Sequence, residues 1–442
     1  VKFKREKFMR YCTKYLDSLF RNDFEKLANQ EYMIKDNLKV TCVKNATVLP
    51  FMPNPTNAAK GTGGVLDENG GYVEESATTQ EDLMVTGYHC DYTKVPIEKE
   101  TVIYLGYFIK QWGHFLVDFL PRLWWVLEHY NGEKVLILTN NSRVKIDGNY
   151  MRMLNVLGIT EDKICYVKEI KRFREIIVPE MSMVRPRYYS EECCKFFATL
   201  TSKITEGVTL KPYSKIYWTR THLKKAKMTE IGEKDIETLF RKNGYKVLTP
   251  EKCSLEELVY YIHNCEEFVS LSGTIPHNVV FAKPGTKCVV LNKIYRINTI
   301  QLMLNKLTGV ETVYIDSHIS LLPASPGGGP FWMYVGKNLL NFAHDQNFVI
   351  PSKYQRNKNS IWLYINAWKK SKLLKKYFMI YCRLQDANLD IGGSICGHAR
   401  PEDGFEDKKI YFFYREKLGL VNTDTNVVSF LTNLYHYLKG EV

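Results

Sequence analysis

Residues 112–122 (WGHFLVDFLPR) contain a histidine and an aspartate, His114 and Asp118, four positions apart. In a helix this spacing places both side chains on one face. The neighbouring residues are apolar, so we expect the pair at the edge of a core, where polar groups are costly unless they are paired or do chemistry. Pro121 is expected to kink the helix one turn later. The alternative is a purely structural histidine at a helix N-terminus.

A second cluster follows in residues 268–281 (FVSLSGTIPHNVVF), a pattern that predicts a strand, a tight turn and a helix. Gly273 permits the sharp turn, and Pro276 suits a first helical turn. The helix N-terminus offers free N–H groups and a partial positive charge, which favour a phosphate or pyrophosphate. Four side chains add hydroxyl, ring or amide donors, namely Ser272, Thr274, His277 and Asn278. An ordinary capped turn is the alternative.

Two further strand ends lie close to this cluster in the predicted fold. Arg220 comes after the predicted strand 215–219, and arginine binds phosphate through two parallel hydrogen bonds. Glu251 follows the next strand and is expected near a ribose or base. In an open α/β sheet, ligands bind beyond the carboxyl ends of the strands, where these residues lie. A surface arginine and a plain loop carboxylate are the alternatives.

Strand and helix patterns alternate from residue 101 onward, which predicts parallel sheets covered by helices. Strands are expected at 101–105, 134–139, 163–167, 174–178, 215–219, 245–248, 268–271, 287–291 and 311–315. Helices are expected at 112–130, 149–157, 190–206, 233–243, 254–264, 276–282 and 295–307. Ser254 and Glu257 predict a capping box for one helix. A break at 207–213 separates two βα series, so we expect two Rossmann-like halves that face a cleft.

The flanking regions differ from this pattern. Residues 1–40 have apolar side chains at helical spacing, and residues 38–100 contain short strand-like runs with a predicted hairpin turn at 67–71. Residues 321–330 are a linker by composition, and 353–376 carry eight basic residues and no acidic ones. That segment is either an interfacial helix on an anionic membrane or a partly buried helix with one basic face. The expected divisions are 1–100, 101–210, 211–320 and 331–442.

Composition narrows the class of protein. The 442 residues carry a formal charge of +13, which suggests an anionic partner such as nucleic acid, a phosphorylated ligand or an acidic membrane. No RNA-binding signature or zinc-finger spacing accompanies the charge. Eleven cysteines without a CxxC pair indicate reduced thiols in the cytoplasm. No apolar run approaches 18 residues, so we expect neither a signal peptide nor a spanning helix.

The order of these motifs resembles glycosyltransferase family 61. The resemblance rests on Arg220, Glu251 after Pro250, the Ser272–Thr274 turn with His277 and Asn278, the later FAKPG at 281–285, and the upstream His114, Asp118 and Leu-Pro. It covers about residues 61–315 and is greatest for bacterial capsular and extracellular polysaccharide enzymes. It implies a GT-B-like α/β fold with an acceptor domain at 101–210, a nucleotide-sugar domain at 211–320, N-terminal helical and hairpin additions, and an α-rich C-terminal extension.

The resemblance also implies a reaction. Family members are similar to inverting, metal-independent enzymes that move a sugar from a nucleotide-sugar, here expected to be a UDP-sugar, to a glycan or lipid-linked glycan acceptor. No cofactor or metal is expected, and no Asp-x-Asp metal motif is present. Asp118 is the favoured base, with His114 orienting it or touching the donor phosphate, and the reverse assignment stays open. We expect a cytoplasmic protein with peripheral contact at the inner face of the plasma membrane and no nucleic-acid partner.

Three departures from the family pattern affect the donor site. Ser272 stands where many members have a histidine before the glycine, and His277 is a candidate for the replacement imidazole. Glu233 is the expected counterpart of a family Asn-Glu, and Leu258 stands in place of a glutamine.

The competing functions are another nucleotide-sugar enzyme such as an epimerase, and a non-catalytic basic module that binds membranes or nucleic acid.

Overall fold

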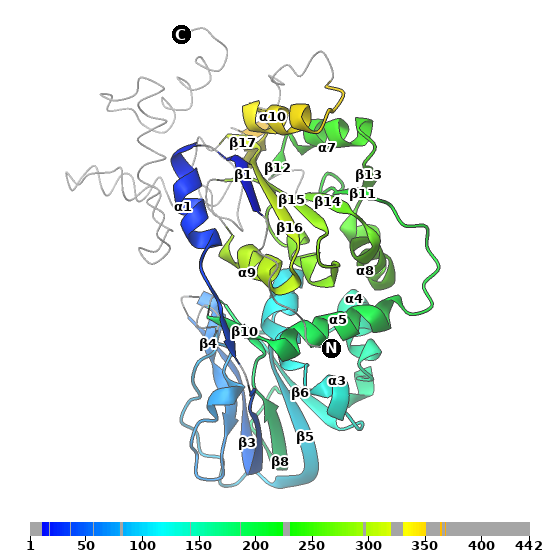
Figure 1. Cartoon of the computed structure of the whole chain (residues 1–442). Coiled ribbons are helices and arrows are strands. Elements are labelled where there is room, and N and C mark those ends of the chain that lie inside the picture. Colours follow the sequence, from blue (N-terminus) through cyan, green and yellow to red (C-terminus); the bar gives the residue numbers. More distant parts are fainter. Residues whose placement is uncertain are drawn as a thin grey trace, which may run out of the picture.

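The protein is described here by a computed structural model, and its two largest elements are six-stranded sheets with helices between them (Figure 1). The described residues are 11–350, except 17, 36, 56, 80–82, 142, 186, 224–229, 295–297 and 320–329, together with 363, 364 and 367. The predicted linker 321–330 and the basic segment 353–376 therefore lie almost entirely outside the described residues. The chain has a mixed α/β fold.

One sheet is wholly parallel. Its strands, in spatial order, are β1 (Tyr11–Tyr15), β16 (Glu311–Asp316), β15 (Lys287–Asn292), β14 (Glu267–Leu271), β11 (Lys215–Trp218) and β13 (Lys246–Leu248). The chain goes outward from β11 to β13 and then returns past β11 to β14. The connection after β11 leads toward β13, and the connection after β14 leads the other way, toward β15. The carboxyl ends of β11 and β14 therefore form a topological switch point, the usual ligand position in such sheets.

The other sheet is mixed. Its strands, in spatial order, are β4 (Asn57–Leu66), β3 (Val40–Asn54), β8 (Lys171–Pro179), β5 (Ile97–Phe108), β6 (Lys134–Thr139) and β7 (Ile164–Tyr166). Strands β8, β5, β6 and β7 are parallel to one another, whereas β3 is antiparallel to both of its neighbours. The chain leaves β5 toward β6 and later returns to β8, so the carboxyl ends of β5 and β8 form a second switch point.

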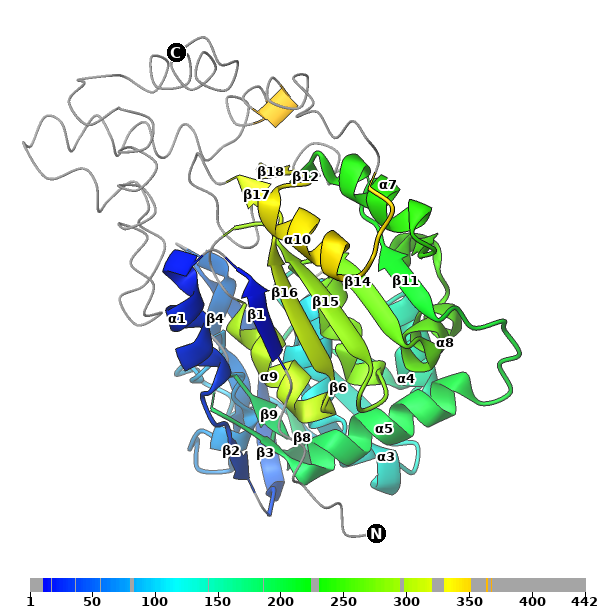
Figure 2. The same cartoon turned by 45° about the horizontal axis from the view of Figure 1, so that its top comes forward.

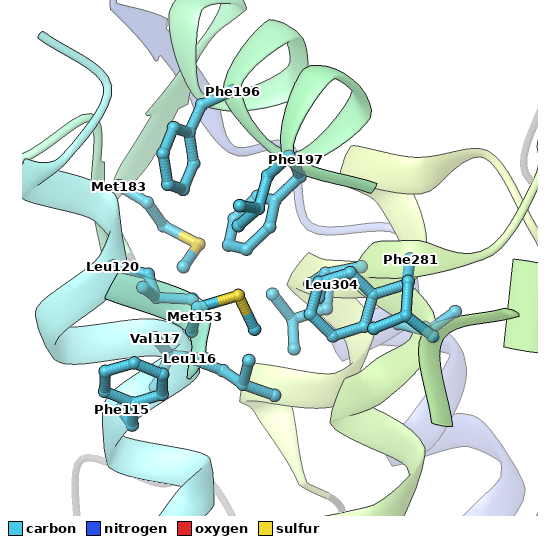
Figure 3. Close-up of a cluster of buried hydrophobic side chains, with 14 of the residues drawn as sticks. Phe115, Leu116, Val117, Leu120, Met153, Met183, Phe196, Phe197, Phe281 and Leu304 are labelled. Carbon is cyan, nitrogen blue, oxygen red and sulfur yellow. The ribbon is translucent and has the colours of Figure 1, made fainter. Parts of the chain in front are cut away.

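Four helices lie between the sheets in both views (Figures 1 and 2). They are α4 (Gly148–Val156), α5 (Glu191–Thr205), α8 (Leu255–Asn264) and α9 (Thr299–Thr308). One apolar cluster joins them to both sheets. In the close-up of Figure 3, Phe115, Leu116 and Leu120 from one half lie across from Phe281 and Leu304 of the other. Because this core is continuous, the two halves pack against each other through buried apolar surface.

The outer face of the parallel sheet has its own core beneath α7 (Glu233–Lys242) and α10 (Lys337–Asp345). The remaining elements complete the edges: α1 (Ser18–Ala28), α3 (Val126–His129), the three-stranded sheet of β2 (Met33–Lys35), β10 (Tyr188–Ser190) and β9 (Met183–Val184), and the three-stranded sheet of β12 (Glu230–Ile231), β18 (Phe331–Met333) and β17 (His318–Ile319). None of the described helices is long and apolar enough to cross a membrane.

Most of the predicted strands and helices are confirmed, including the capping box of Ser254 and Glu257 and the turn at 67–71. The helical prediction at the N-terminus is wrong for residues 11–15. These residues form β1, which pairs with β16, about 300 positions later in the chain. The sequence YCTKY is rich in aromatic and β-branched residues, and β16 offers an otherwise open parallel edge.

Two helical predictions near the site are corrected. Residues 112–130 form four short pieces: α2 (Trp112–His114), a π-helical turn (Phe115–Phe119), a 3₁₀ turn (Leu120–Arg122) and α3. Pro121 has no N–H and cannot continue an α-helix, and the wider π turn precedes it. The predicted helix 276–282 is a seven-residue 3₁₀ segment, Ile275–Phe281. Its N-terminus therefore lacks the aligned dipoles of a long α-helix.

Candidate functional site

Most of the predicted site residues fall at the two switch points. His114 and Asp118 follow the carboxyl end of β5. Arg185 directly follows β9, the short strand that comes after β8, and β8 is the neighbour of β5 in the mixed sheet. Arg220 follows β11, and the Ser272–Thr274 turn follows β14, again on adjacent strands. Each group thus comes from two strand ends that are next to each other in space but far apart in sequence.

Local backbone structure holds His114 and Asp118 on one side of the π turn. Gln111 caps the segment, because its side-chain oxygen accepts a hydrogen bond from the backbone N–H of His114 at 2.8 Å. The π turn closes where Leu120 N–H bonds to the carbonyl of Phe115. Such turns change the direction of neighbouring side chains and are frequent at functional sites.

Asp118 is the centre of the first cluster. Its Oδ2 lies 2.5 Å from His114 Nδ1, and its Oδ1 accepts a hydrogen bond from Arg185 Nη2 at 3.1 Å. The side chains of Asp118 and Arg185 are only 2% and 6% exposed, whereas that of His114 is 32% exposed. The carboxylate is therefore held from both sides below the surface, and the imidazole is the member of the cluster that reaches solvent.

His277 lies close enough to this first cluster for the charges of the cluster to shift its pKa. Burial lowers its pKa to about 3, with the positive charge of Arg185 acting in the same direction and Asp118 opposing it. The imidazole is thus neutral near pH 7. Asn298 caps α9 through its Oδ1, so its amide nitrogen faces His277 Nε2 at 3.1 Å. The proton of the imidazole is then on Nδ1, which has no hydrogen-bond partner among the described residues.

Two hydrogen bonds join the halves beside this cluster. Gln111 Nε2 donates to Thr274 Oγ1 at 3.1 Å, and Trp112 Nε1 donates to Asn278 Oδ1 at 2.8 Å. The amide nitrogen of Asn278 donates to the carbonyl of Ile275 at 2.7 Å. Asn278 therefore uses both ends of its amide to hold the turn against the other half, which is a structural role distinct from the predicted phosphate contact.

The second cluster is centred on Glu230. Its Oε2 accepts a hydrogen bond from Arg220 Nε at 2.7 Å, and its Oε1 accepts one from Lys293 Nζ at 2.8 Å. Burial alone would raise the pKa of Glu230, but the two cations lower it. Glu230 is therefore ionised at neutral pH and carries one negative charge between two positive ones.

Glu233 stands at the start of α7 and positions Arg220. Its Oε1 accepts hydrogen bonds from the backbone N–H of Arg220 at 3.0 Å and from the Tyr217 hydroxyl at 3.3 Å. Its Oε2 has no partner among the described residues. Burial raises its pKa to about 8, and the neighbouring Glu230 adds to the shift. Glu233 and Glu230 both line a cavity of about 380 Å³, which also contacts Leu363 of the C-terminal region.

The other predicted residues occupy different positions. Ser272 Oγ accepts a hydrogen bond from the backbone N–H of Lys293 at 3.2 Å, which fixes Lys293 beside the turn. Glu251 is exposed in a 3₁₀ turn after the edge strand β13. No hydrogen bond or ion pair among the described residues joins Glu251 to either cluster. Leu258 is buried in α8 and belongs to the core between the halves.

Sequence reasoning missed Arg185, Glu230 and Lys293. Glu230 and Lys293 are 63 positions apart, and Arg185 is 67 positions from Asp118, so no local spacing indicates either pair. Lys293 did carry one signal, because it lies two residues after the predicted strand 287–291 of the parallel sheet.

A family model described as Glycosyltransferase 61 matches residues 112–289. This range contains the whole first cluster and, from the second, Arg220, Glu230 and Glu233. No curated protein matches the chain. In the part of the chain that the structure describes, no three His, Cys, Asp or Glu side chains are grouped so that they could hold a metal ion.

Proposed function

We propose, from the premise that residues 112–289 belong to glycosyltransferase family 61, that this glycosyltransferase uses a nucleotide-sugar donor and inverts the anomeric centre without a metal ion. The family implies a sugar donor and a glycan acceptor. One observation carries the finer proposal. The imidazole–carboxylate pair lies at the switch point of one sheet, and the cationic cluster lies at the switch point of the other. Hydrogen bonds join the two halves of the molecule beside the imidazole–carboxylate pair.

His114 is our choice for the base. Asp118 uses both carboxylate oxygens on its neighbours and is 2% exposed, so it is poorly placed to meet an acceptor hydroxyl. With Nδ1 of His114 donating to Asp118, Nε2 is the ring nitrogen that can accept a proton. Asp118 then orients the imidazole and stabilises its charged form, as carboxylates do for catalytic histidines. The preference for Asp118 as base, drawn from the sequence, is reversed in this proposal.

Inversion needs a single displacement. The acceptor oxygen forms a bond to the anomeric carbon while His114 Nε2 takes its proton. The bond from that carbon to the diphosphate oxygen breaks, and its electron pair leaves with the diphosphate. We assign to Arg220 the stabilisation of the negative charge on the leaving diphosphate, because guanidinium groups pair with phosphate oxygens and stay charged at any relevant pH. In this assignment, the parallel sheet carries the donor and the mixed sheet carries the acceptor, as in a GT-B arrangement.

The biological setting is a further part of the proposal. The Ser272–Thr274 turn matches bacterial members of the resemblance, which favours a role in surface polysaccharide synthesis with a UDP-sugar as donor. The charge of +13 and the free cysteines of the described residues agree with a protein at the cytoplasmic face of an anionic membrane.

A donor screen tests the proposal. The melting temperature of the full chain is measured with UDP-, GDP- and CMP-sugars, with and without EDTA, since a ligand that binds the folded state raises it by mass action. We expect a UDP-sugar to stabilise the protein equally in both conditions and to be transferred to a glycan acceptor. Absence of a response to every nucleotide sugar contradicts the proposal, and a changed sugar formed without an acceptor identifies an epimerase instead.

A further inference from the structure

We propose that Lys293 is a second cation of the donor site, and that Glu230 holds Lys293 and Arg220 together as a seat for the diphosphate of the donor. The inference rests on the proposed nucleotide-sugar function and adds to it a residue that no sequence motif indicated. Lys293 follows β15 and lies outside the residues that the family model matches.

The position of Lys293 is fixed on several sides. Its Nζ donates to Glu230 Oε1 at 2.8 Å and lies 4.4 Å from the centre of the Phe331 ring, a cation–π distance. Its backbone N–H donates to Ser272 Oγ. The side chain is only 8% exposed, so little water competes with a ligand for its charge. A lysine held this rigidly loses little side-chain entropy when an anion binds.

Gly273 provides the space that a ligand needs. A Cβ atom built on Gly273 would lie 3.5 Å from Lys293 Nζ, and no other described atom outside the two adjacent residues would lie within 4 Å of it. The backbone at this glycine has a φ of +138°, a conformation that side chains disfavour. The volume above the turn therefore stays open, and the ammonium group of Lys293 forms one of its walls.

The charge balance of the cluster favours an anion. Arg220 and Lys293 contribute two positive charges, and Glu230 contributes one negative charge. Glu233 keeps its proton near pH 7, because burial raises its pKa to about 8. The sum is one positive charge in a largely buried site. Such fixed charges can stabilise a leaving diphosphate in the place of a divalent cation.

The test uses inorganic pyrophosphate, because this group is common to all nucleotide diphosphate sugars. Its dissociation constant is measured by calorimetry for the full chain and for Lys293→Met, which keeps the length of the side chain and removes its charge. Glu230 remains paired with Arg220 in this variant. We expect binding to weaken roughly tenfold to a hundredfold, the effect of losing one charged hydrogen bond.

Lys287→Met is the matched control. Lys287 stands at the other end of β15 and is also paired with a buried glutamate, Glu267, at 3.0 Å. Its substitution removes the same net charge at the opposite end of β15, away from the cluster, so we expect an unchanged dissociation constant. Equal binding by Lys293→Met and the wild-type chain overturns the inference. If the wild-type chain still transfers sugar in that case, the proposed function stands.

Glu230→Gln separates a binding role from a structural one. This variant leaves Lys293 and Arg220 without their counter-anion, which destabilises the fold. In our proposal, pyrophosphate replaces the missing anion, so it should raise the melting temperature of Glu230→Gln by more than that of the wild-type chain. If pyrophosphate has the same or a smaller effect on the variant, Glu230 and its two cations are only a structural ion cluster.

Discussion

Asp118 and Glu230 are two buried carboxylates in similar surroundings. Asp118 lies at the switch point of the mixed sheet, and Glu230 is bonded to Arg220 at the switch point of the parallel sheet. Each carboxylate divides its two oxygens between two basic side chains. The difference is in the partners. Asp118 is shared by Arg185 and a histidine, whereas Glu230 is shared by Arg220 and Lys293.

This difference decides what each cluster can do. Histidine can gain or lose a proton in the physiological range, so the Asp118 cluster can accept a proton from a substrate. Arg220 keeps its charge at any relevant pH. Burial lowers the pKa of Lys293, but the ionised Glu230 opposes this shift, so the Glu230 cluster is suited to hold a charged ligand in place. Two similar arrangements of buried carboxylates therefore suit two different halves of one transfer reaction. Three predictions test how far this comparison holds.

The largest expected effect is on proton transfer. Replacing His114 by alanine removes the proposed base, so we expect kcat to fall about 10²–10⁴-fold while binding of UDP stays unchanged. Imidazole added to the assay should restore part of the activity, because it can occupy the vacated space and take the proton. Steady-state rates and calorimetry on the same preparation separate the two effects.

His129→Ala is the control for this prediction. His129 is exposed, stacks on Trp125 and contacts neither cluster, so its loss should leave kcat unchanged. If His114→Ala keeps a kcat near that of the wild-type chain while Asp118→Asn abolishes transfer, Asp118 is the base and the comparison between the two clusters loses its basis.

A smaller effect is expected on stability. Arg185→Met removes the permanent cation from Asp118 and leaves it with a histidine alone, so we expect the free energy of unfolding to fall by about 3–5 kcal/mol. Lys293→Met should cost less, because Glu230 keeps Arg220. Urea unfolding measures both. Arg187→Met, at an exposed position two residues along, is the control for Arg185 and should have little effect.

An equal decrease in the free energy of unfolding in Arg185→Met and Lys293→Met would contradict this prediction. It would mean that the partner left on each carboxylate stabilises it equally, whether that partner is histidine or arginine. The distinction between a proton-transfer cluster and a charge-holding cluster would then have no energetic basis.

The strands that position both clusters were predicted from the sequence more accurately than the residues that form the clusters. Strands such as β6 and β15 have unbroken apolar runs, so their bounds are visible locally, and the rule that ligands bind at strand ends placed Arg220 and Gly273 correctly at one edge. Pairings between distant segments were not visible. β1 joins β16 across some 300 positions, and nothing local to residues 11–15 indicates that partner.

The missed residues have the same cause. Arg185 and Lys293 each meet a carboxylate more than 60 positions away, so their roles depend on how the sheets bring strand ends together. The π-helical turn in the predicted helix after β5 was missed for a different reason. Periodicity indicates that residues 112–120 are helical, but it does not distinguish an α turn from a π turn, and that distinction sets the direction of Asp118.

The smallest expected effect concerns a third carboxylate, Glu233, which has no cation on its Oε2. Its pKa is about 8 in the fold and near 4.5 when unfolded, so between these values the folded chain holds one more proton than the unfolded chain. The free energy of unfolding therefore falls as pH rises through this window, by up to about 1.4 kcal/mol per pH unit from this group. Glu233→Gln has no proton to lose there, so its stability should fall less steeply than that of the wild-type chain between pH 5 and 8.

Glu237→Gln, one helical turn further along α7, is the control with the opposite sign. Burial alone would raise the pKa of Glu237, but hydrogen bonds from Lys234, Thr221 and Thr219 lower it. Its contribution to stability is therefore complete above pH 4.5 and is lost only as the pH falls further, so this variant should keep the wild-type slope between pH 5 and 8. If Glu233→Gln also keeps that slope, Glu233 is ionised at neutral pH. The Glu230 cluster would then carry no net charge, and its proposed preference for an anion would lose its electrostatic support.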